Sequence, residues 1–325
     1  MTQPLVKVEN LRVLFKSIDR TVHAVNGVDF ALQPGEVLGL LGESGSGKSV
    51  TLKALLRLLP ERRATLSGKV TVAGHDVLAM DERALRQYRG GVVSMIFQEP
   101  MLAFDPVFTV GDQITEAVMR HEDVDREAGR KRALEMLERV RIPSPKRRLD
   151  AYPHEMSGGM RQRAMIALAL ACKPQLLLAD EPTTALDATV QIQILLLLRE
   201  LQKEFGMAVI FVTHDVGVAV EVSDRMAVMY GGRIVERGSA RDVIRATAHP
   251  YPQGLLQSTV HGAMRGTRLE AIGGAPPDLS RLPAGCAFAP RCRLADDLCR
   301  TTLPPVVAIA PGHAAECHRP NGRSS

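Results

Sequence analysis

The chain has 325 residues, a formal net charge of +5, 45% hydrophobic residues and 24% charged residues. This composition is typical of a folded globular protein and excludes a chain that is disordered throughout. The longest apolar runs, residues 164–172 and 194–198, are far shorter than the roughly 20 residues that span a bilayer, so no membrane-spanning helix is predicted. The start of the chain lacks the basic and then apolar pattern of an export signal. Tryptophan is absent and aromatic residues are few, so we expect no nucleic-acid partner.

The first third of the chain predicts a small β subdomain followed by a phosphate site. Residues 6–15 and 23–32 alternate apolar and polar side chains, as strands do, and residues 36–41 form a short apolar run typical of a buried parallel strand. The stretch GESGSGKS at 42–49 fits the pattern G-x-x-x-x-G-K-[ST] and precedes a helical pattern that extends to Leu59. Its backbone N–H groups and Lys48 would hold nucleotide phosphates, and the Ser49 hydroxyl would bind Mg²⁺.

The middle of the chain alternates strands and helices. Residues 68–97 predict strands around one helix, residues 110–140 an exposed helical subdomain, and residues 175–213 two buried strands joined by a helix. The run 225–238 predicts a hairpin that turns at Gly231-Gly232. The predicted fold class is therefore α/β, with a mostly parallel sheet core, an antiparallel β subdomain and a helical subdomain at about 99–165.

Two further motifs carry chemistry. The apolar run LLLADEP at 176–182 ends in two carboxylates: Asp180 would support Mg²⁺, and Glu181 would orient and deprotonate the attacking water. The run SGGMRQR begins a long helix with Ser157, Gly158 and Gly159, which predicts a second phosphate-binding helix N-terminus. An ordinary capped helix start is the alternative, but it leaves two helix-weakening glycines unexplained.

With Gln98 in FQEP, the TALD run at 184–187 and His214 in VTHD, residues 4–245 resemble an ATP-binding cassette (ABC) ATPase. In that family two cassettes face head to tail, and the ATP bound by one is closed over by the signature segment of the other. The resemblance implies that Gln98 senses Mg²⁺ and the attacking water, that Asp187 couples the two sites, and that His214 contacts the γ-phosphate. It also implies that Phe15 stacks on adenine, although the core of the β subdomain is an alternative place for this ring.

The ATP-binding residues implied by the resemblance are Gly42, Glu43, Ser44, Gly45, Ser46, Gly47, Lys48, Ser49, Val50 and Phe15, with Ser49, Gln98 and Asp180 at Mg²⁺, and with Glu181, His214 and Gln98 as catalytic residues. Two positions depart from the usual pattern. Val50 replaces a Thr or Gln, so a side-chain contact to phosphate is lost while its N–H remains. The signature reads SGGM, where many members have SGGQ, which alters the surface that faces the second cassette.

Residues 246–325 form a Pro-, Gly- and Ala-rich segment that we treat as a C-terminal extension to the cassette at 1–245. HPYPQGLLQS at 249–258 and GCAFAPRCRLADDLC at 285–299 resemble the extension of peptide-importer ATPases, in particular the D-type subunit of the dipeptide, oligopeptide and nickel importers. The resemblance implies ATP hydrolysis that energises uptake of di- or oligopeptides. Alternatives are a nickel or other small-solute importer, and a soluble ABC ATPase that acts on nucleic acid or ribosomes.

The resemblance also implies partners and a location. The partners are a second, homologous ATPase subunit, two membrane permeases and an extracytoplasmic solute-binding protein. The location is the cytoplasmic face of the inner membrane, with the chain attached peripherally. The segment 100–110 is expected to dock the permeases through exposed Met101, Leu102, Phe104 and Phe108, although it could also be a plain surface loop.

Four of the five cysteines, Cys286, Cys292, Cys299 and Cys317, gather in the last forty residues with the spacing C-x5-C-x6-C-x17-C. Four thiols in a small, Pro-rich segment suit Zn²⁺ or an iron–sulfur cluster, and unliganded thiols are also possible. The irregular spacing and the resemblance favour a [4Fe–4S] cluster over zinc. Cys172 stands in an apolar helical run and is expected to be a core thiol.

Overall fold

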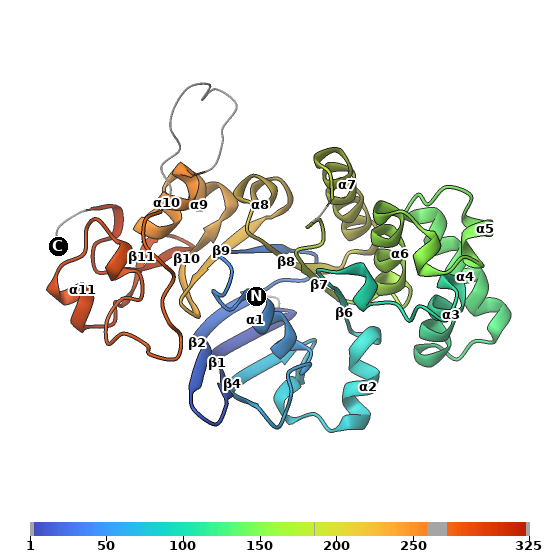
Figure 1. Cartoon of the computed structure of the whole chain (residues 1–325), viewed down its shortest axis with the longest axis horizontal. Coiled ribbons are helices and arrows are strands. Elements are labelled where there is room, and N and C mark those ends of the chain that lie inside the picture. The colour runs from blue at the N-terminus through green and yellow to red at the C-terminus, as the bar shows by residue number, and fades with distance from the viewer. Residues whose placement is uncertain (1–2, 185, 259–271, 323–325) are drawn as a thin grey trace. The chain divides into compact units, whose positions relative to one another are not determined.

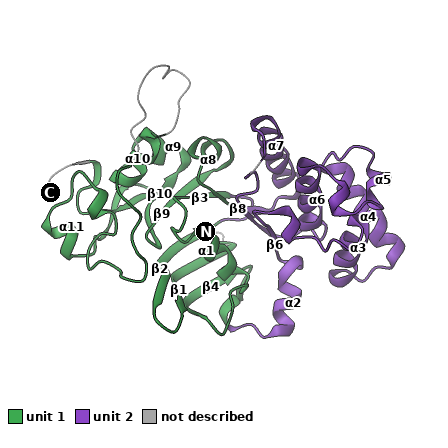
Figure 2. Cartoon of the chain, viewed as in Figure 1, with its two compact units in different colours: residues 1–32, 37–78, 211–325 green, residues 33–36, 79–210 purple. Residues whose placement is uncertain are grey.

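The computed structural model describes residues 3–184, 186–258 and 272–322, and Figure 1 traces their helices and strands along the chain. The chain divides into two compact units, coloured separately in Figure 2. The first unit comprises residues 1–32, 37–78 and 211–325, and the second comprises residues 33–36 and 79–210. No described helix is both long enough and apolar enough to cross a membrane.

The first unit contains an antiparallel sheet with the strand order β2-β1-β4-β5. On β1 the buried and exposed side chains alternate, because successive residues of a strand point to opposite faces of a sheet. Its strands are β1 (Val6–Lys16), β2 (Thr21–Leu32), β4 (Ala64–Val72) and β5 (His75–Asp76). This sheet is the predicted β subdomain.

The second sheet of this unit has the strand order β11-β12-β10-β9-β3. All five residues of β3 are buried, and β3 pairs in parallel with β9, as expected for a strand that is covered on both faces. The hairpin of β9 and β10 turns at Gly231 and Gly232, which both have positive φ. Its strands are β3 (Val37–Leu41), β9 (Arg225–Tyr230), β10 (Arg233–Ser239), β11 (Val306–Ala310) and β12 (His313–Glu316).

The C-terminal extension adds two strands and part of a core to the first unit. β12 pairs with β10, and the carboxylate of Glu316 accepts a hydrogen bond from Arg233 at 2.6 Å. The rings of Tyr230, Tyr251 and Phe288 pack in one hydrophobic cluster, of which the last two residues belong to the extension. The helices of this unit are α1 (Lys48–Leu55), α8 (Val216–Val222), α9 (Ala240–Arg245), α10 (Pro250–Gln257) and α11 (Asp297–Thr301).

The second unit places helices around a short parallel sheet. β6 pairs in parallel with β7, and β8, whose first residues belong to this unit, is the next strand in the order β8-β7-β6. Most of the helices begin at a capping side chain, such as Asp81, Thr109 or Asp125, which accepts a hydrogen bond from a backbone N–H of the first turn. The elements are α2 (Glu82–Gly91), β6 (Val93–Ile96), α3 (Val110–His121), α4 (Arg126–Arg139), α5 (Pro145–Leu149), α6 (Gly158–Leu170), β7 (Leu176–Asp180), α7 (Ala188–Phe205) and β8 (Ala208–Thr213).

Two sequence-based expectations about local structure are corrected. The helix after the glycine-rich stretch ends at Leu55 and not at Leu59, because Arg57 has a φ of 48° and Pro60 disfavours a helical residue before it. Phe104, expected on the surface, is only 5% exposed. Its neighbours Met101, Leu102 and Phe108 are exposed as expected.

Candidate nucleotide site

The phosphate loop, residues 42–49, joins β3 to α1 within the first unit. Glycine is required where the loop passes close to neighbouring backbone. Gly47 has a φ of 102°, and a Cβ there would lie 2.5 Å from the carbonyl oxygen of Ala24. A Cβ at Gly42 would lie 2.3 Å from the carbonyl oxygen of Met229. These two positions fix a tight loop that leads directly into the N-terminus of a helix, where anions are stabilised.

The polar groups of the loop suit a phosphate ligand. The Lys48 side chain is buried, and its Nζ donates to the carbonyl oxygens of Gly42 at 2.7 Å and Glu43 at 2.9 Å. The hydroxyl of Ser46 is buried and has no hydrogen-bond partner among the described residues. Ser49 and Val50 follow, partly buried, in the first turn of α1. Buried hydroxyl groups in proteins are normally hydrogen-bonded, and a bound oxyanion would supply the missing partner of Ser46.

The other predicted site residues of the first unit lie on neighbouring elements. Phe15 is half-buried on β1, paired in register with Val22 and Ala64. His214 is exposed directly after β8, and Asp215 then caps α8. The adenine role of Phe15 and the γ-phosphate role of His214 remain predictions.

In the second unit, the end of β7 gathers three of the predicted residues. Asp180 is buried at the last position of the strand. Glu181 has a φ of 46°, a left-handed conformation that is strained for a side chain other than glycine. Its Oε2 accepts hydrogen bonds from Gln98 Nε2 at 3.3 Å and from Thr184 Oγ1 at 2.9 Å. Gln98 and Glu181, 83 residues apart in sequence, are therefore neighbours, while their catalytic roles remain predictions.

The signature segment opens α6 in the same unit. Ser157 is exposed and caps the helix, since its hydroxyl accepts a hydrogen bond from Met160 N–H at 3.3 Å. A Cβ at Gly158 would meet no atom within 4 Å, whereas a Cβ at Gly159 would lie 3.3 Å from Val190. Nothing within the described chain therefore requires glycine at 158, and the helix N-terminus is left open at its surface.

The predicted coupling residue also has a structural role. Asp187 caps α7, because its Oδ1 accepts a hydrogen bond from Val190 N–H at 3.0 Å. In the TALD run, Ala185 lies outside the described residues. The role of Asp187 in coupling two cassettes remains a prediction.

The four cysteines of the extension are near one another but do not form a closed ligand set. All four are free thiols. Burial, with smaller contributions from the charges of the other three thiols, raises the pKa of Cys286 to about 11. Within the described residues, no group of three or more His, Cys, Asp or Glu side chains has the arrangement of a metal site. The donor chemistry is nevertheless suitable, because the N–H groups of Leu294 and Arg319 donate to the sulfurs of Cys292 and Cys317 at 3.4 and 3.3 Å.

Sequence reasoning missed three residues at or near the site. Thr184 supports Glu181 from the loop after β7, while Tyr251 and Arg291 of the extension reach Glu43 of the phosphate loop. The local sequence carries a signal only for Thr184, three residues after the carboxylate. The other two are more than 200 residues from Glu43, so their roles depend on tertiary packing. Cys172 is a half-buried thiol whose pKa burial raises to about 11, in agreement with a structural role.

Two family descriptions match the chain. Residues 25–184 match the ABC transporter family, and residues 235–299 match the C-terminal region of the oligopeptide/dipeptide transporters. The first match includes the phosphate loop, Gln98, Glu181 and the signature segment. The second includes three of the four clustered cysteines and the residues of the extension that contact Glu43.

Curated relatives match over nearly the whole chain. A probable peptide ABC transporter ATP-binding protein of Sinorhizobium fredii is 50% identical, over 98% of this chain and 95% of its own length. The oligopeptide transport ATP-binding protein of Salmonella typhimurium is 46% identical, over 97% and 94%. The dipeptide transport ATP-binding protein of Bacillus subtilis is 45% identical, over 97% and 94%.

Solved structures confirm the predicted fold class. A dimeric ATP-binding cassette in a post-hydrolysis state, bound to ADP and Pi, superposes with a TM-score of 0.66 at 30% identity, covering 73% of this chain and 99% of that one. The cassette CbiO1 of Clostridium perfringens, part of an ABC transporter complex, superposes with a TM-score of 0.64 at 27% identity, covering 74% and 91%. The chain therefore belongs to the ATPase subunits of ABC transporters, in the group that carries the oligopeptide/dipeptide transporter C-terminal region.

Proposed function

We propose that this ATPase energises the uptake of di- or oligopeptides through an ABC importer. The observation that carries the proposal is the presence of a phosphate loop and a peptide-transporter C-terminal region in one chain. Relatives that match both regions over nearly their full length are named as peptide, oligopeptide and dipeptide transport proteins. The reaction is ATP + H₂O → ADP + Pi, coupled to rearrangement of a partner permease.

The site residues have separate roles in this proposal. Residues 42–49 hold the β- and γ-phosphates, with Lys48 as their positive partner. Ser49, Gln98 and Asp180 would hold Mg²⁺, directly or through water, and the ion would neutralise charge that develops on the phosphates. Glu181 takes the proton of the attacking water, and its hydrogen bonds from Gln98 and Thr184 support the required orientation of the carboxylate. Phe15 stacks on adenine and His214 contacts the γ-phosphate.

The second cassette contributes its own signature segment to the ATP bound here, and the signature of this chain serves the ATP of its partner. The open surface at Gly158 supports this arrangement, because a helix N-terminus with no side chain in the way can approach a γ-phosphate. Asp187 couples the two sites. We propose that the second cassette is a homologous chain.

The permeases dock on an exposed apolar segment of the second unit. Met101, Leu102, Val107 and Phe108 are 42 to 71% exposed within eight residues, which is unusual for side chains of this size. Docking there places the chain at the cytoplasmic face of the membrane, held by its partners. An extracytoplasmic solute-binding protein delivers the peptide to the permeases and does not contact this chain.

The transport proposal is tested by reconstitution. The chain, its permeases, a second ATPase subunit and the solute-binding protein are placed in lipid vesicles with ATP inside and a labelled dipeptide or oligopeptide outside. We expect peptide accumulation that needs ATP and is lost in the Glu181→Gln variant, with Glu138→Gln, an exposed carboxylate on α4, as the control. Accumulation of nickel without accumulation of peptide would contradict the proposal.

We also propose that Cys286, Cys292, Cys299 and Cys317 hold one [4Fe–4S] cluster with a structural role. The support is four free thiols in one small segment, with backbone N–H groups aimed at two of the sulfurs. Bound iron would cross-link a segment that has few apolar side chains of its own.

Protein purified without oxygen should be brown and contain about four irons per chain, as a Cys₄ cubane does. Any one of the four Cys→Ser changes should bleach it and increase protease cleavage within residues 280–320. Cys172→Ser is the matched control and should keep the colour. A colourless protein with one tightly bound zinc per chain would contradict the cluster.

A further inference from the structure

The C-terminal extension contacts the phosphate loop at Glu43. The Arg291 guanidinium donates to both carboxylate oxygens, with Nη1–Oε2 at 2.7 Å and Nη2–Oε1 at 3.0 Å. The hydroxyl of Tyr251 accepts a hydrogen bond from the Glu43 N–H at 2.8 Å. The Arg291 side chain is 5% exposed and that of Glu43 is 27% exposed. A bidentate pair this well shielded is stronger and more specific in geometry than a surface ion pair.

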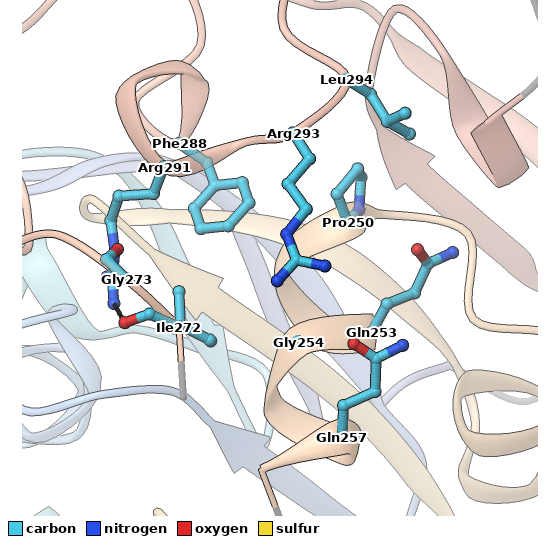
Figure 3. A pocket seen from close by; sticks show the side chains of 10 residues that line it. All are labelled: Pro250, Gln253, Gly254, Gln257, Ile272, Gly273, Phe288, Arg291, Arg293 and Leu294. Carbon is cyan, nitrogen blue, oxygen red and sulfur yellow. Dashed lines mark hydrogen bonds between the residues drawn. The ribbon is translucent and has the colours of Figure 1, made fainter. Parts of the chain in front are cut away.

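Arg291 is itself fixed by the extension and by β9. Its Nε donates to the carbonyl oxygen of Gly273 at 2.9 Å, and its Nη1 donates to the Tyr230 hydroxyl at 3.2 Å. Its Nη2 donates to the carbonyl oxygen of Ile272 at 3.2 Å (Figure 3). Its guanidinium lies 5.8 Å from the ring centre of Tyr230 and 5.9 Å from that of Phe288. The carboxylate of Glu43 raises the pKa of Arg291, so its charge is permanent. The arginine is therefore a rigid support for the loop.

Glu43 in turn holds the lysine that serves the phosphates. Its carbonyl oxygen accepts hydrogen bonds from Lys48 Nζ at 2.9 Å and from Ser46 N–H at 3.2 Å. The N–H, the carbonyl and the carboxylate of Glu43 are thus all occupied, two of them by the extension. A displacement of Glu43 would move the carbonyl that places Lys48, and it would change the loop on which phosphate binding depends.

We infer that Arg291 and Tyr251 of the C-terminal extension are positioning residues that preorganise the phosphate loop for nucleotide through Glu43. This inference rests on the proposed assignment of residues 42–49 as the ATP site. The inference gives the extension a direct function in the ATPase, because both residues belong to it. Arg291 lies between Cys286 and Cys292 in sequence, and Tyr251 packs in the hydrophobic cluster with Phe288. A loop that is already ordered loses less entropy when it binds.

The test compares Arg291→Met with Arg281→Met in the full-length chain. Methionine keeps an apolar stem against the rings and removes the guanidinium. Arg291 also lines a cavity of about 260 Å³ (Figure 3), so the shorter side chain introduces no clash. Arg281 is an exposed arginine of the same extension and is the matched control. Binding of a fluorescent ATP analogue and hydrogen exchange of the amides at 42–49 are measured for each variant.

We expect Arg291→Met to weaken nucleotide binding by about tenfold or more, the loss expected when a charged hydrogen-bonded pair is broken. Exchange at 42–49 should become faster, and the KM for ATP of the assembled transporter should rise more than kcat falls. Arg291→Lys should recover part of the affinity, since lysine restores the charge but not the bidentate geometry. Arg281→Met should match the wild type in all three measurements.

Two further variants keep the inference testable if Arg291→Met is unstable. Tyr251→Phe removes only the hydroxyl that receives the Glu43 N–H, and it should accelerate exchange at 42–49. Glu43→Gln should weaken binding, and combining it with Arg291→Met should add little, because both changes break the same pair. Unchanged affinity and exchange in Arg291→Lys, Tyr251→Phe and Glu43→Gln would overturn the inference. ATP binding that survives Lys48→Ala would instead overturn the assignment of the ATP site.

Discussion

At the end of β7, the chain holds Glu181 in a left-handed backbone conformation with a φ of 46° and two hydrogen bonds on one carboxylate oxygen. Strain of this kind persists only where the surroundings enforce it, and it is common at catalytic positions. We expect Glu181→Gln to keep ATP binding but to lower turnover by about 10²–10⁴, because an amide cannot accept the proton of the water. Steady-state ATPase assays and analogue binding separate the two effects. Turnover near that of the wild type would contradict the assignment of Glu181 as the general base.

Lys48 is proposed to bind the nucleotide, whereas Glu181 is proposed to act in catalysis. The Lys48 Nζ donates to two loop carbonyls, and its positive charge would attract the phosphates of the nucleotide. Lys48→Ala should therefore weaken binding of the nucleotide itself, unlike Glu181→Gln. Titration with a fluorescent ATP analogue measures it, with Lys53→Ala on α1 as the control for loss of one lysine from the same helix. Equal affinity in Lys48→Ala and the control would contradict the assignment.

At the scale of elements, the N-terminus of α6 combines an exposed cap, Ser157, with a glycine that no neighbour in the described chain requires. Ser157→Arg should block the approach of a nucleotide held by another cassette while leaving the phosphate loop of its own chain intact. We expect ATPase activity of the assembled transporter to be largely lost and nucleotide binding to the isolated chain to be preserved. An equal loss of binding in the isolated chain would place the signature at its own phosphate loop.

The N-terminus of α10 predicts a pH dependence of stability. His249 caps this helix, because its Nδ1 accepts a hydrogen bond from the Tyr251 N–H, and its ring packs near Phe288. Its backbone N–H donates to the buried carboxylate of Glu236. Burial lowers the pKa of the His249 side chain to about 3. In the unfolded chain it takes up a proton near pH 6.5, and in the folded chain only near pH 3. The free energy of unfolding should therefore fall as the pH falls through this interval, by roughly 1.4 kcal/mol per pKa unit.

The variant His249→Asn isolates this contribution. Asparagine can cap the same N–H and does not titrate, so the decline of stability between about pH 6.5 and pH 3 should become shallower. Urea unfolding at a series of pH values measures it, and His75→Asn, an exposed histidine on β5, is the control. A slope identical to that of the wild type would show that His249 titrates normally in the folded chain.

Most elements of the cassette could be predicted because their signals are local. Alternation marks β1 and β2, and a short apolar run before a glycine-rich stretch marks β3 and α1. The strands β11 and β12 could not be predicted, since residues 306–310 and 313–316 lie in Pro- and Gly-rich sequence. They are ordered by tertiary pairing, β12 with β10 and β11 with β12. The burial of Phe104 and the Arg291–Glu43 pair depend on tertiary packing for the same reason.

At the scale of the whole molecule, the proposed catalytic residues and the proposed signature segment belong to one chain, yet in the proposed assembly each signature acts on the ATP of a partner. A single copy therefore carries a phosphate loop without a second cassette to close its ATP. The apolar side chains of Met101, Leu102 and Phe108 are likewise exposed in the single chain. These features predict that rapid ATP hydrolysis requires the chain to assemble with the permeases and a second ATPase subunit.

We therefore expect the isolated chain to bind ATP but to hydrolyse it slowly, and we expect turnover to rise when the permeases and a second ATPase subunit are added. Positive groups around the γ-phosphate stabilise the charge of the transition state, and in the proposed assembly part of them comes from the signature segment of the partner. The measurement is ATPase activity against the concentration of the added subunits. Leu102→Glu, at a side chain that is 71% exposed, should reduce this stimulation without changing the slow basal rate, because a charge there opposes docking in an apolar interface. Leu298→Glu, at a 50% exposed leucine on α11, is the matched control, and equal stimulation in both variants would exclude the segment 100–110 as the docking site.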